Sequence, residues 1–240
     1  MSLIKTILAF GLTMLAMIVF IPIALPALIL GLFGFKKVTA WLVYKLAQGW
    51  SRGVVGIVGS PVEVTGREFI PNQEGICFVS NHAGVFDIIL ALAYIGRPFG
   101  FIAKKELTLI PFINLWILFL GGLFIDRKSI RKALKTIKSG IKKIQNGNNM
   151  LIFPEGTRSK GQGLLPFKSG AIKLATQSLA PIVPIAISGS YDVFEKEKRV
   201  LAAPVKIVFC RPIITSEMSS DDRRNLLVTQ VHSAIEAALK

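Results

Sequence analysis

The stretch FVSNHAGVFDIIL, residues 78–90, joins an apolar run, a polar turn and the beginning of a second apolar segment. Its first part, which ends at Ser80, predicts a buried strand, and the apolar residues after the turn predict a helix. Strand and helix alternate in the same way over residues 54–240, with no repeat or long linker between them. The sequence therefore predicts one α/β domain with a mixed, largely parallel central sheet flanked by helices.

The remaining elements follow from short apolar runs and from helical periodicity. The expected strands are residues 62–64, 76–79, 99–103, 123–125, 150–153, 182–187 and 205–209. The expected helices are residues 86–95, 111–120, 129–146, 170–177 and 221–238, the last capped by Ser219 or Ser220.

The composition excludes a disordered chain and indicates an anionic partner. The chain has 240 residues, of which 52% are hydrophobic and 18% charged, and its mean hydropathy is +0.56. It carries 29 Lys and Arg against 14 Asp and Glu, a net charge of +15. Nucleic acid, an anionic membrane surface and a phosphorylated substrate are all compatible with this charge.

The N-terminus contains an apolar run with the length of a membrane span. Thr6 to Phe35 include no charged residue, and Lys5, Lys36 and Lys37 flank the run. It exceeds the roughly 20 residues that cross a bilayer as a helix. Pro22 and Pro26 are expected to kink or break such a helix. A cleaved signal peptide is disfavoured because no small-residue cleavage site is followed by a polar segment.

The segment that follows, residues 36–53, mixes aromatic and basic residues as membrane interfaces do. In one arrangement residues 6–30 span the membrane and residues 36–53 form a surface helix; in another, both helices lie in one leaflet as a two-helix anchor. A buried helix pair in a soluble protein is the third possibility. We expect residues 1–53 to anchor the protein and residues 54–240 to form one catalytic or binding domain. The basic flank places that domain on the cytoplasmic side of the cell membrane.

Residues 127–144 form a strongly amphipathic helical pattern. One face is purely basic, and no acidic residue occurs between Asp126 and Glu155 to neutralise it. The basic residues are Arg131, Lys132, Lys135, Lys138, Lys142 and Lys143; the opposite face carries Ile130, Ala133, Leu134, Ile137, Ile141 and Ile144. This basic stripe meets solvent, anionic headgroups or an acidic protein that carries a substrate.

The turn after the strand that ends at Ser80 can supply a general base. His82 is followed five residues later by Asp87, which can orient the imidazole and stabilise its charged form. Since no Gly-x-Ser-x-Gly elbow and no reactive cysteine completes a triad, the base would activate a substrate hydroxyl directly. A histidine that only caps the following helix is the alternative.

Three further strand ends carry cations and a glycine turn suited to phosphate. They supply Lys104 and Lys105, then Asp126 and Arg127, then Glu155, Gly156, Thr157 and Arg158. Arginine presents a multi-donor fork, glycine lets backbone amides approach an anion, and Glu155 is expected to hold a basic or amide group of the turn. The carboxyl ends of the strands bring these residues to one crevice.

Metal chemistry is not predicted. Cys77 and Cys210 lie inside apolar runs as reduced thiols, and neither His82 nor His232 has a metal-ligand neighbour at useful spacing.

Four ordered blocks resemble the glycerolipid acyltransferase family, and among its members those that acylate lysophosphatidate. They are NHAGVFD (81–87), GGLFIDR (121–127), FPEGTRS (153–159) and VPIAI (183–187), and the AKKEL segment (103–107) also matches. The resemblance implies that His82, oriented by Asp87, deprotonates the free hydroxyl, which attacks the thioester of acyl-acyl-carrier protein or acyl-CoA to form phosphatidate. It further implies that Lys104 or Lys105, Arg127, Arg158 and the 155–157 turn hold the substrate phosphate. No cofactor is implied.

Other functions stay open at this point. The acceptor could be glycerol 3-phosphate or another lysolipid, and a noncatalytic protein that binds lipid surfaces would use the same anchor and stripe. Binding to nucleic acid is disfavoured because the basic stripe lacks interleaved aromatic residues.

Overall fold

The computed structural model describes residues 3–240 and contains a seven-stranded sheet in the order β1-β7-β6-β2-β5-β3-β4. Neighbouring strands are parallel except β6 and β7, which are antiparallel. The strands are β1 (Val62–Thr65), β2 (Cys77–Ser80), β3 (Gly100–Lys104), β4 (Leu123–Ile125), β5 (Met150–Ile152), β6 (Ile182–Ser188) and β7 (Val205–Phe209). The expected mixed, largely parallel α/β fold and its strands are confirmed.

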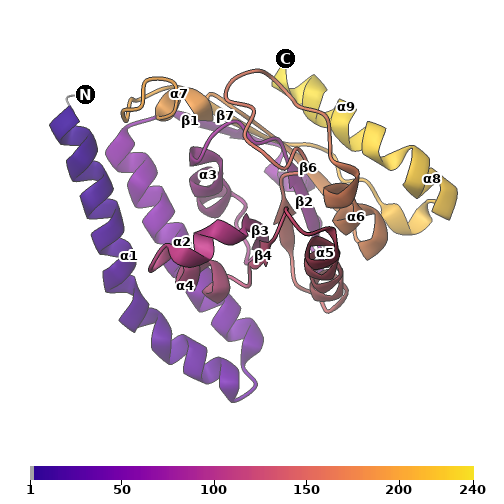
Figure 1. The fold of residues 1–240 in the computed structure, drawn as a ribbon, viewed down its shortest axis with the longest axis horizontal. Coiled ribbons are helices and arrows are strands. Elements are labelled where there is room, and N and C mark those ends of the chain that lie inside the picture. Colours follow the sequence, from indigo (N-terminus) through magenta and orange to yellow (C-terminus); the bar gives the residue numbers. More distant parts are fainter. Residues whose placement is uncertain (1–2) are drawn as a thin grey trace.

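Helices cover both faces of the sheet. The α-helices are α1 (Leu3–Leu32), α2 (Lys36–Val58), α3 (Phe86–Tyr94), α4 (Ile113–Phe119), α5 (Ile130–Gln145), α6 (Ser169–Ser178), α7 (Ser190–Val193), α8 (Ser220–Asn225) and α9 (Leu227–Leu239). Short 3-10 turns are η1 (Arg67–Phe69), η2 (Lys105–Leu109) and η3 (Thr215–Glu217). One hydrophobic cluster joins α1–α4 to the sheet, and a second joins α5, α6 and α9 to it. Figure 1 shows these two groups on either side of the strands.

The C-terminal helix differs from the expectation. Residues 221–238 were predicted as one helix, but α8 and α9 are separate, with Leu226 between them. Ser219 caps α8 by accepting a hydrogen bond from the amide of Asp222 at 3.1 Å, which confirms the predicted cap.

The two N-terminal helices form a hairpin beside the sheet (Figure 1). Helix α1 continues through Pro22 and Pro26, so the expected break does not occur. The segment Phe10–Leu32 has a mean hydropathy of 2.6, and only 17% of its 18-residue apolar stretch is buried. A core helix would be mostly buried; this helix has the exposure and composition of a membrane-associated one.

Helix α2 is built into the core. It continues past residue 53 to Val58, and Val43, Tyr44 and Ala47 on its inner face are buried. The Tyr44 hydroxyl donates a hydrogen bond to the Leu92 carbonyl at 3.2 Å and accepts one from the Gly96 amide at 2.8 Å. These bonds fix α2 to α3, so the helix hairpin and the sheet share one core.

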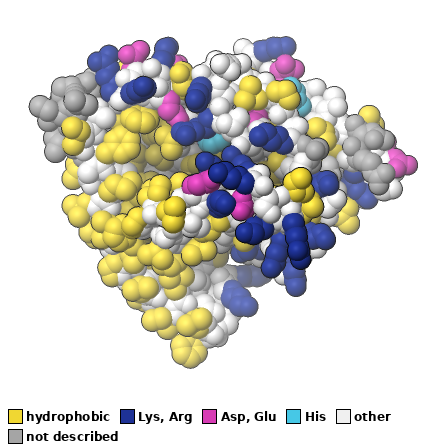
Figure 2. All heavy atoms as spheres, in the orientation of Figure 1, with side chains coloured by type: hydrophobic (Ala, Val, Ile, Leu, Met, Phe, Trp, Pro, Cys, Tyr) yellow, Lys and Arg dark blue, Asp and Glu magenta, His cyan; other side chains and the backbone are white. Residues whose placement is uncertain are grey.

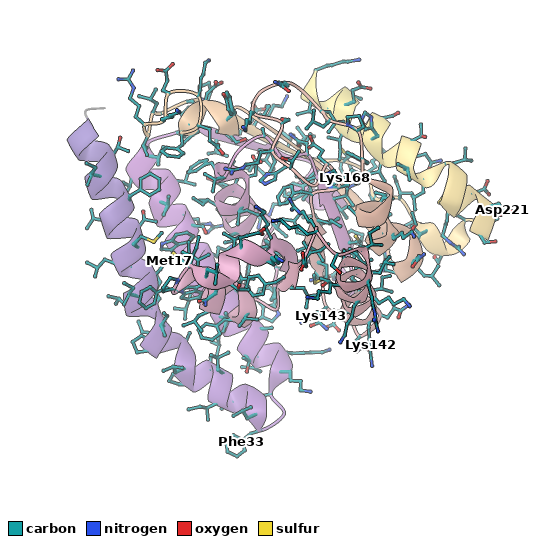
Figure 3. The ribbon with its side chains drawn as sticks, in the orientation of Figure 1. Met17, Phe33, Lys142, Lys143, Lys168 and Asp221 are labelled. Atoms are coloured by element: carbon teal, nitrogen blue, oxygen red, sulfur yellow. The ribbon has the colours of Figure 1, made fainter. Side chains whose placement is uncertain are left out.

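Helix α5 carries the basic stripe on its outer face. Arg131, Lys132, Lys135, Lys138 and Lys142 are exposed, and Lys143 is half-buried. The ion pairs found within the described part of the chain include none of them. Lys142 points away from the sheet in Figure 3.

The apolar face of α5 is only partly buried. Ile130 is 80% exposed and Leu134 is 38% exposed, whereas Ile137 and Ile144 are buried. The helix begins next to β4, the last strand of the sheet, so its first turns extend beside an edge that offers little surface to cover them.

Candidate active site

The predicted functional residues lie at one edge of the sheet. Strands β2, β5, β3 and β4 are neighbours and run parallel, so their carboxyl ends meet at the same edge. His82, Glu155, Lys105 and Arg127 each follow one of these ends. The predicted convergence of strand ends is therefore present.

A short hydrogen bond joins His82 to Asp87. The His82 Nδ1 atom lies 2.7 Å from Asp87 Oδ2, and the Asp87 side chain is fully buried. The same oxygen accepts hydrogen bonds from the amides of Ala83 at 2.8 Å and Gly84 at 3.0 Å. Asp87 also lies in the first turn of α3, where the positive helix end favours a carboxylate. Asp87 thus fixes both the turn and the ring, and leaves Nε2 as the nitrogen that can exchange a proton.

Two other groups hold His82 in place. Phe153 stacks on the imidazole with ring centroids 4.2 Å apart and an interplanar angle of 25°. The buried Glu155 carboxylate accepts hydrogen bonds from the amides of His82 at 2.6 Å and Leu165 at 3.0 Å. Burial raises the pKa of Glu155. Glu155 therefore holds amide groups, as expected, but these belong to His82 and Leu165 and not to its own turn.

The predicted cations each contact protein groups at this edge. Lys105 pairs with Asp126 at 2.8 Å, which raises the pKa of Lys105 and lowers that of Asp126. Lys104 lies 3.5 Å from Glu106. Arg127 donates a hydrogen bond to the carbonyl of Gly156, which joins the ends of β4 and β5.

Arg158 is held by a residue that the sequence motifs do not include. Its guanidinium pairs with Glu195 at 2.6 Å. The two carboxylate oxygens of Glu195 also accept the Val85 amide at 2.9 and 3.0 Å. Glu195 follows α7, a helix that the sequence did not predict, so no local signal linked it to the site.

Lys168 is a further cation that sequence reasoning missed. Its side chain lies over Gly156, where a methyl group would meet Cδ at 2.9 Å and Nζ at 3.3 Å. Gly156 has φ of +67°, a conformation that favours glycine. Lys168 directly precedes α6 within the FKSG stretch, and Figure 3 labels it near that helix. The sequence signal that could have identified Lys168 is its position in a polar turn next to a glycine.

Asn81 anchors the turn between His82 and Asp87 to the sheet. Its buried amide donates to the Ile187 carbonyl and accepts from the Ile187 amide, both at 2.8 Å. Thr157 is exposed in the glycine turn.

An apolar cavity of about 340 Å³ lies next to the turn between His82 and Asp87. It is enclosed mainly by α1–α4 and includes Val85 from the turn between His82 and Asp87. Other lining residues are Phe10, Met17, Trp50, Ile89 and Trp116. No single segment reveals this cavity, because four helices far apart in sequence enclose it.

Among the residues that the structure describes, no group of three or more His, Cys, Asp or Glu is arranged to hold a metal ion. Cys77 and Cys210 are unpaired, the first buried and the second half-buried, in agreement with the predicted thiols.

The fold and site define an α/β protein that holds a histidine–aspartate pair beside a cluster of cations and an apolar cavity. Comparison with known proteins identifies the family to which it belongs. The chain belongs to the acyltransferase family, whose family model matches residues 61–188.

Named relatives agree with this family. A 1-acyl-sn-glycerol-3-phosphate acyltransferase from Cocos nucifera is 33% identical over 201 residues, which cover 80% of this chain and 64% of that protein. Its counterpart from Salmonella typhimurium is 31% identical over 171 residues, covering 71% and 69%. The match to a relative from Borreliella burgdorferi spans 56% of that protein. The chain therefore spans less than two thirds of the length of the Cocos nucifera and Borreliella burgdorferi proteins.

A solved structure shares the fold over nearly the whole chain. The crystal structure of the 1-acyl-sn-glycerophosphate (LPA) acyltransferase PlsC from Thermotoga maritima has a TM-score of 0.77 and 25% sequence identity. The match covers 98% of this chain and 96% of that one, so it includes the N-terminal helices.

Proposed function

We propose that this protein transfers an acyl chain from an acyl thioester to the free hydroxyl of 1-acyl-glycerol 3-phosphate and so makes phosphatidate. The observation that carries the proposal is the 2.7 Å contact between His82 and Asp87 at the edge of the sheet where the cations gather. An apolar cavity adjoins this pair. Base, anion-binding groups and apolar volume are what acylation of a phosphorylated lipid requires.

In this mechanism His82 Nε2 takes the proton from the acceptor hydroxyl, and the oxygen attacks the thioester carbonyl. Asp87 keeps the Nδ1 proton on the imidazole and stabilises the imidazolium ion that forms. The carbon–sulfur bond then breaks, and the thiolate recovers a proton from His82. Neither a metal nor a cofactor enters this balance.

The substrate phosphate would lie among the cations that follow β3, β4 and β5. Lys104, Lys105, Arg127 and Arg158 supply positive charge, and the Glu155-Gly156-Thr157 turn supplies a hydroxyl and close backbone approach. Lys168, which lies over Gly156, adds to this set.

The apolar cavity would hold an acyl chain. Its lining by Phe10, Ile89 and Trp116 suits an alkyl chain and excludes charged groups. Because Val85 belongs to both the turn between His82 and Asp87 and the cavity wall, a chain in the cavity begins next to His82.

The N-terminal helices would hold the enzyme on the cytoplasmic side of the cell membrane, with residues 1–53 as the anchor and residues 54–240 as the catalytic domain. The exposed apolar surface of α1 and the basic residues that follow it support this placement. The +15 net charge favours approach to an anionic membrane, to anionic lysophosphatidate and to either acyl-acyl-carrier protein or acyl-CoA.

The test is acyl transfer by the purified full chain in vesicles that contain lysophosphatidate, with labelled acyl-acyl-carrier protein and acyl-CoA as parallel donors. His82→Ala should reduce phosphatidate formation by at least about 100-fold while vesicle binding persists. His232→Ala is the matched control, since His232 packs against Phe167 on the other side of the sheet. Unchanged turnover in His82→Ala would refute the general-base role.

The same assay separates the alternatives. Product only from glycerol 3-phosphate or from another lysolipid would change the acceptor but keep the reaction. Vesicle binding without product from any acceptor would favour a noncatalytic lipid-binding protein. A salt-sensitive gel shift at physiological ionic strength would be needed to support nucleic-acid binding.

A further inference from the structure

The segment that links β3 to β4 exposes an apolar surface although it belongs to the catalytic domain. Leu107 to Ile125 include no charged residue. Its exposed large side chains are Leu109, Ile110, Phe112, Leu115 and Leu118, of which Leu109 is 82% and Leu118 is 55% exposed. We call these five residues the η2–α4 patch.

The patch is held rigidly by the opposite side of the same segment. Trp116 and Ile117 are buried in the core, which fixes the orientation of α4 and leaves its outer side uncovered. Phe112, just before α4, has φ of +65°, a conformation that is costly for an aromatic residue. The fold thus maintains strained backbone at a position where a phenyl group is 39% exposed.

The patch is continuous with the apolar surface of α1. The Trp116 indole donates a hydrogen bond to the Met17 carbonyl at 3.0 Å, so α4 lies directly against the middle of α1. Met17 lies on the side of α1 that faces α4 in Figure 3. Exposed residues of α1 near this contact include Leu15, Ile18 and Val19. Figure 2 shows hydrophobic side chains gathered over this side of the molecule, while Lys and Arg gather over α5.

We propose that the η2–α4 patch is a second membrane-inserting surface, which lies in the same bilayer leaflet as the apolar face of α1. The proposal rests on the membrane association described above. A lipid bilayer is the occupant that matches the patch, because the surface continues onto a helix with the hydropathy of a membrane span.

This arrangement gives the cavity a direct boundary with lipid. Phe10, Met14 and Met17 of α1 line one part of the cavity, and Leu107, Ile113 and Trp116 of the η2–α4 segment line another. With both segments in the leaflet, a lipid chain reaches the cavity without crossing water.

Site-specific labelling tests the proposal in the full chain. A nitrobenzoxadiazole label is attached to Leu109→Cys in a Cys210→Ser background; Cys77 is fully buried and stays unlabelled. Leu179→Cys is the matched control, since Leu179 is 51% exposed next to the cluster on the other side of the sheet. Leu25→Cys, on an exposed α1 position, reports insertion of α1 itself.

With vesicles of phosphatidylcholine and phosphatidylglycerol, the fluorescence emission of the labels at 109 and 25 should shift to shorter wavelength. Lipids that carry a doxyl group should quench that fluorescence. The emission of the label at 179 should show neither change. A shift at 25 without one at 109 would overturn the proposal and leave α1 insertion intact. No shift at either position would overturn both. A shift at 109 that depends on protein concentration and needs no vesicles would identify a second copy as the occupant and also overturn the proposal.

Substitution gives an independent measurement. Leu109→Glu with Leu118→Glu should weaken partition into vesicles by at least about tenfold, because each leucine loses the gain from burial of its side chain. Leu179→Glu should leave partition unchanged. Neither Leu109 nor Leu118 lines the cavity, so acyl transfer to lysophosphatidate dispersed in detergent should persist. Equal partition of the double variant and the wild type would contradict insertion.

Discussion

At the scale of single residues, His82 is constrained on three sides. Asp87 binds Nδ1, Phe153 covers a ring face and Glu155 holds the backbone amide. Asp87 belongs to α3, whereas Phe153 and Glu155 both follow β5, so the ring orientation depends on the packing of β2, β5 and α3 together. The proposed base, held in this way, loses little entropy when the substrate hydroxyl arrives.

Glu195 is expected to position Arg158 for the substrate phosphate. In Glu195→Gln the amide has no charge to hold the guanidinium, so we expect the KM for lysophosphatidate to rise about tenfold while kcat changes less. Steady-state kinetics in vesicles measure this. Glu197→Gln, which removes an exposed partner of Arg199, is the control. A KM that falls would instead mean that Glu195 competes with the phosphate for Arg158.

The ionisation of Glu155 is expected to oppose folding. Burial raises its pKa in the folded state, so the folded chain takes up a proton at a higher pH than the unfolded chain does. The destabilisation is therefore present above the folded pKa and disappears as the pH falls to the ordinary glutamate value. Thermal unfolding of wild type and Glu155→Gln at a series of pH values checks this: their difference should move in favour of the wild type as the pH falls. The opposite slope would mean that hydrogen bonds to the carboxylate outweigh its burial.

At the scale of elements, α5 combines an unpaired basic stripe with the exposed side chains of Ile130 and Leu134. Lys135→Glu with Lys138→Glu should weaken binding to anionic vesicles by about 1 kcal/mol for each lysine removed, and high salt should abolish the difference. Cosedimentation with anionic and neutral vesicles measures this.

The control for this prediction is Lys173→Glu with Lys206→Glu, which changes the net charge equally at exposed positions outside α5. Equal loss in both double variants would show that net charge alone matters. No loss in either would show that the stripe only meets solvent.

The strands and most helices were predictable because their apolar patterns are local. Residues 123–125 and 205–209 were identified with the bounds that the structure gives. The exposure of Ile130 was not predictable, since it depends on β4 being the edge strand, which periodicity does not encode. The short helix α7 and the interruption at Leu226 likewise depend on packing between distant segments.

At the scale of the whole molecule, the helix hairpin and the sheet are expected to unfold together. Tyr44→Phe removes buried hydrogen bonds with Leu92 and Gly96, and should lower the free energy of unfolding by about 1–3 kcal/mol. Denaturant unfolding in a mild detergent should show one transition for both proteins, shifted in the variant. Tyr94→Phe, a half-buried position, is the control.

Two separate transitions would mean that the hairpin is an independent domain. The hydrogen bonds of Tyr44 with Leu92 and Gly96 also affect how the loss of residues 1–52 would be interpreted. A fragment that starts near residue 53 lacks Tyr44, so loss of vesicle binding by that fragment would report on folding as well as on anchoring.

The candidate site was predictable where one strand end carries its own chemistry, as at His82 and Arg158. It was not predictable where distant segments meet. Glu195 contacts Val85 across 110 positions of sequence, and the cavity requires four helices. Contacts and cavities of this kind arise from tertiary packing, which the local pattern of a single sequence does not predict.

The contact between Trp116 and Met17 also sets an order of events during synthesis. Its two residues are 99 positions apart, so a ribosome that adds about 5–20 residues per second needs roughly 5–20 s between them. Throughout that interval the apolar helix α1 has been made but its partner on α4 has not. A nascent chain of this kind needs an apolar surrounding before its own core exists, which favours delivery of the ribosome to the membrane over release of a finished chain into water.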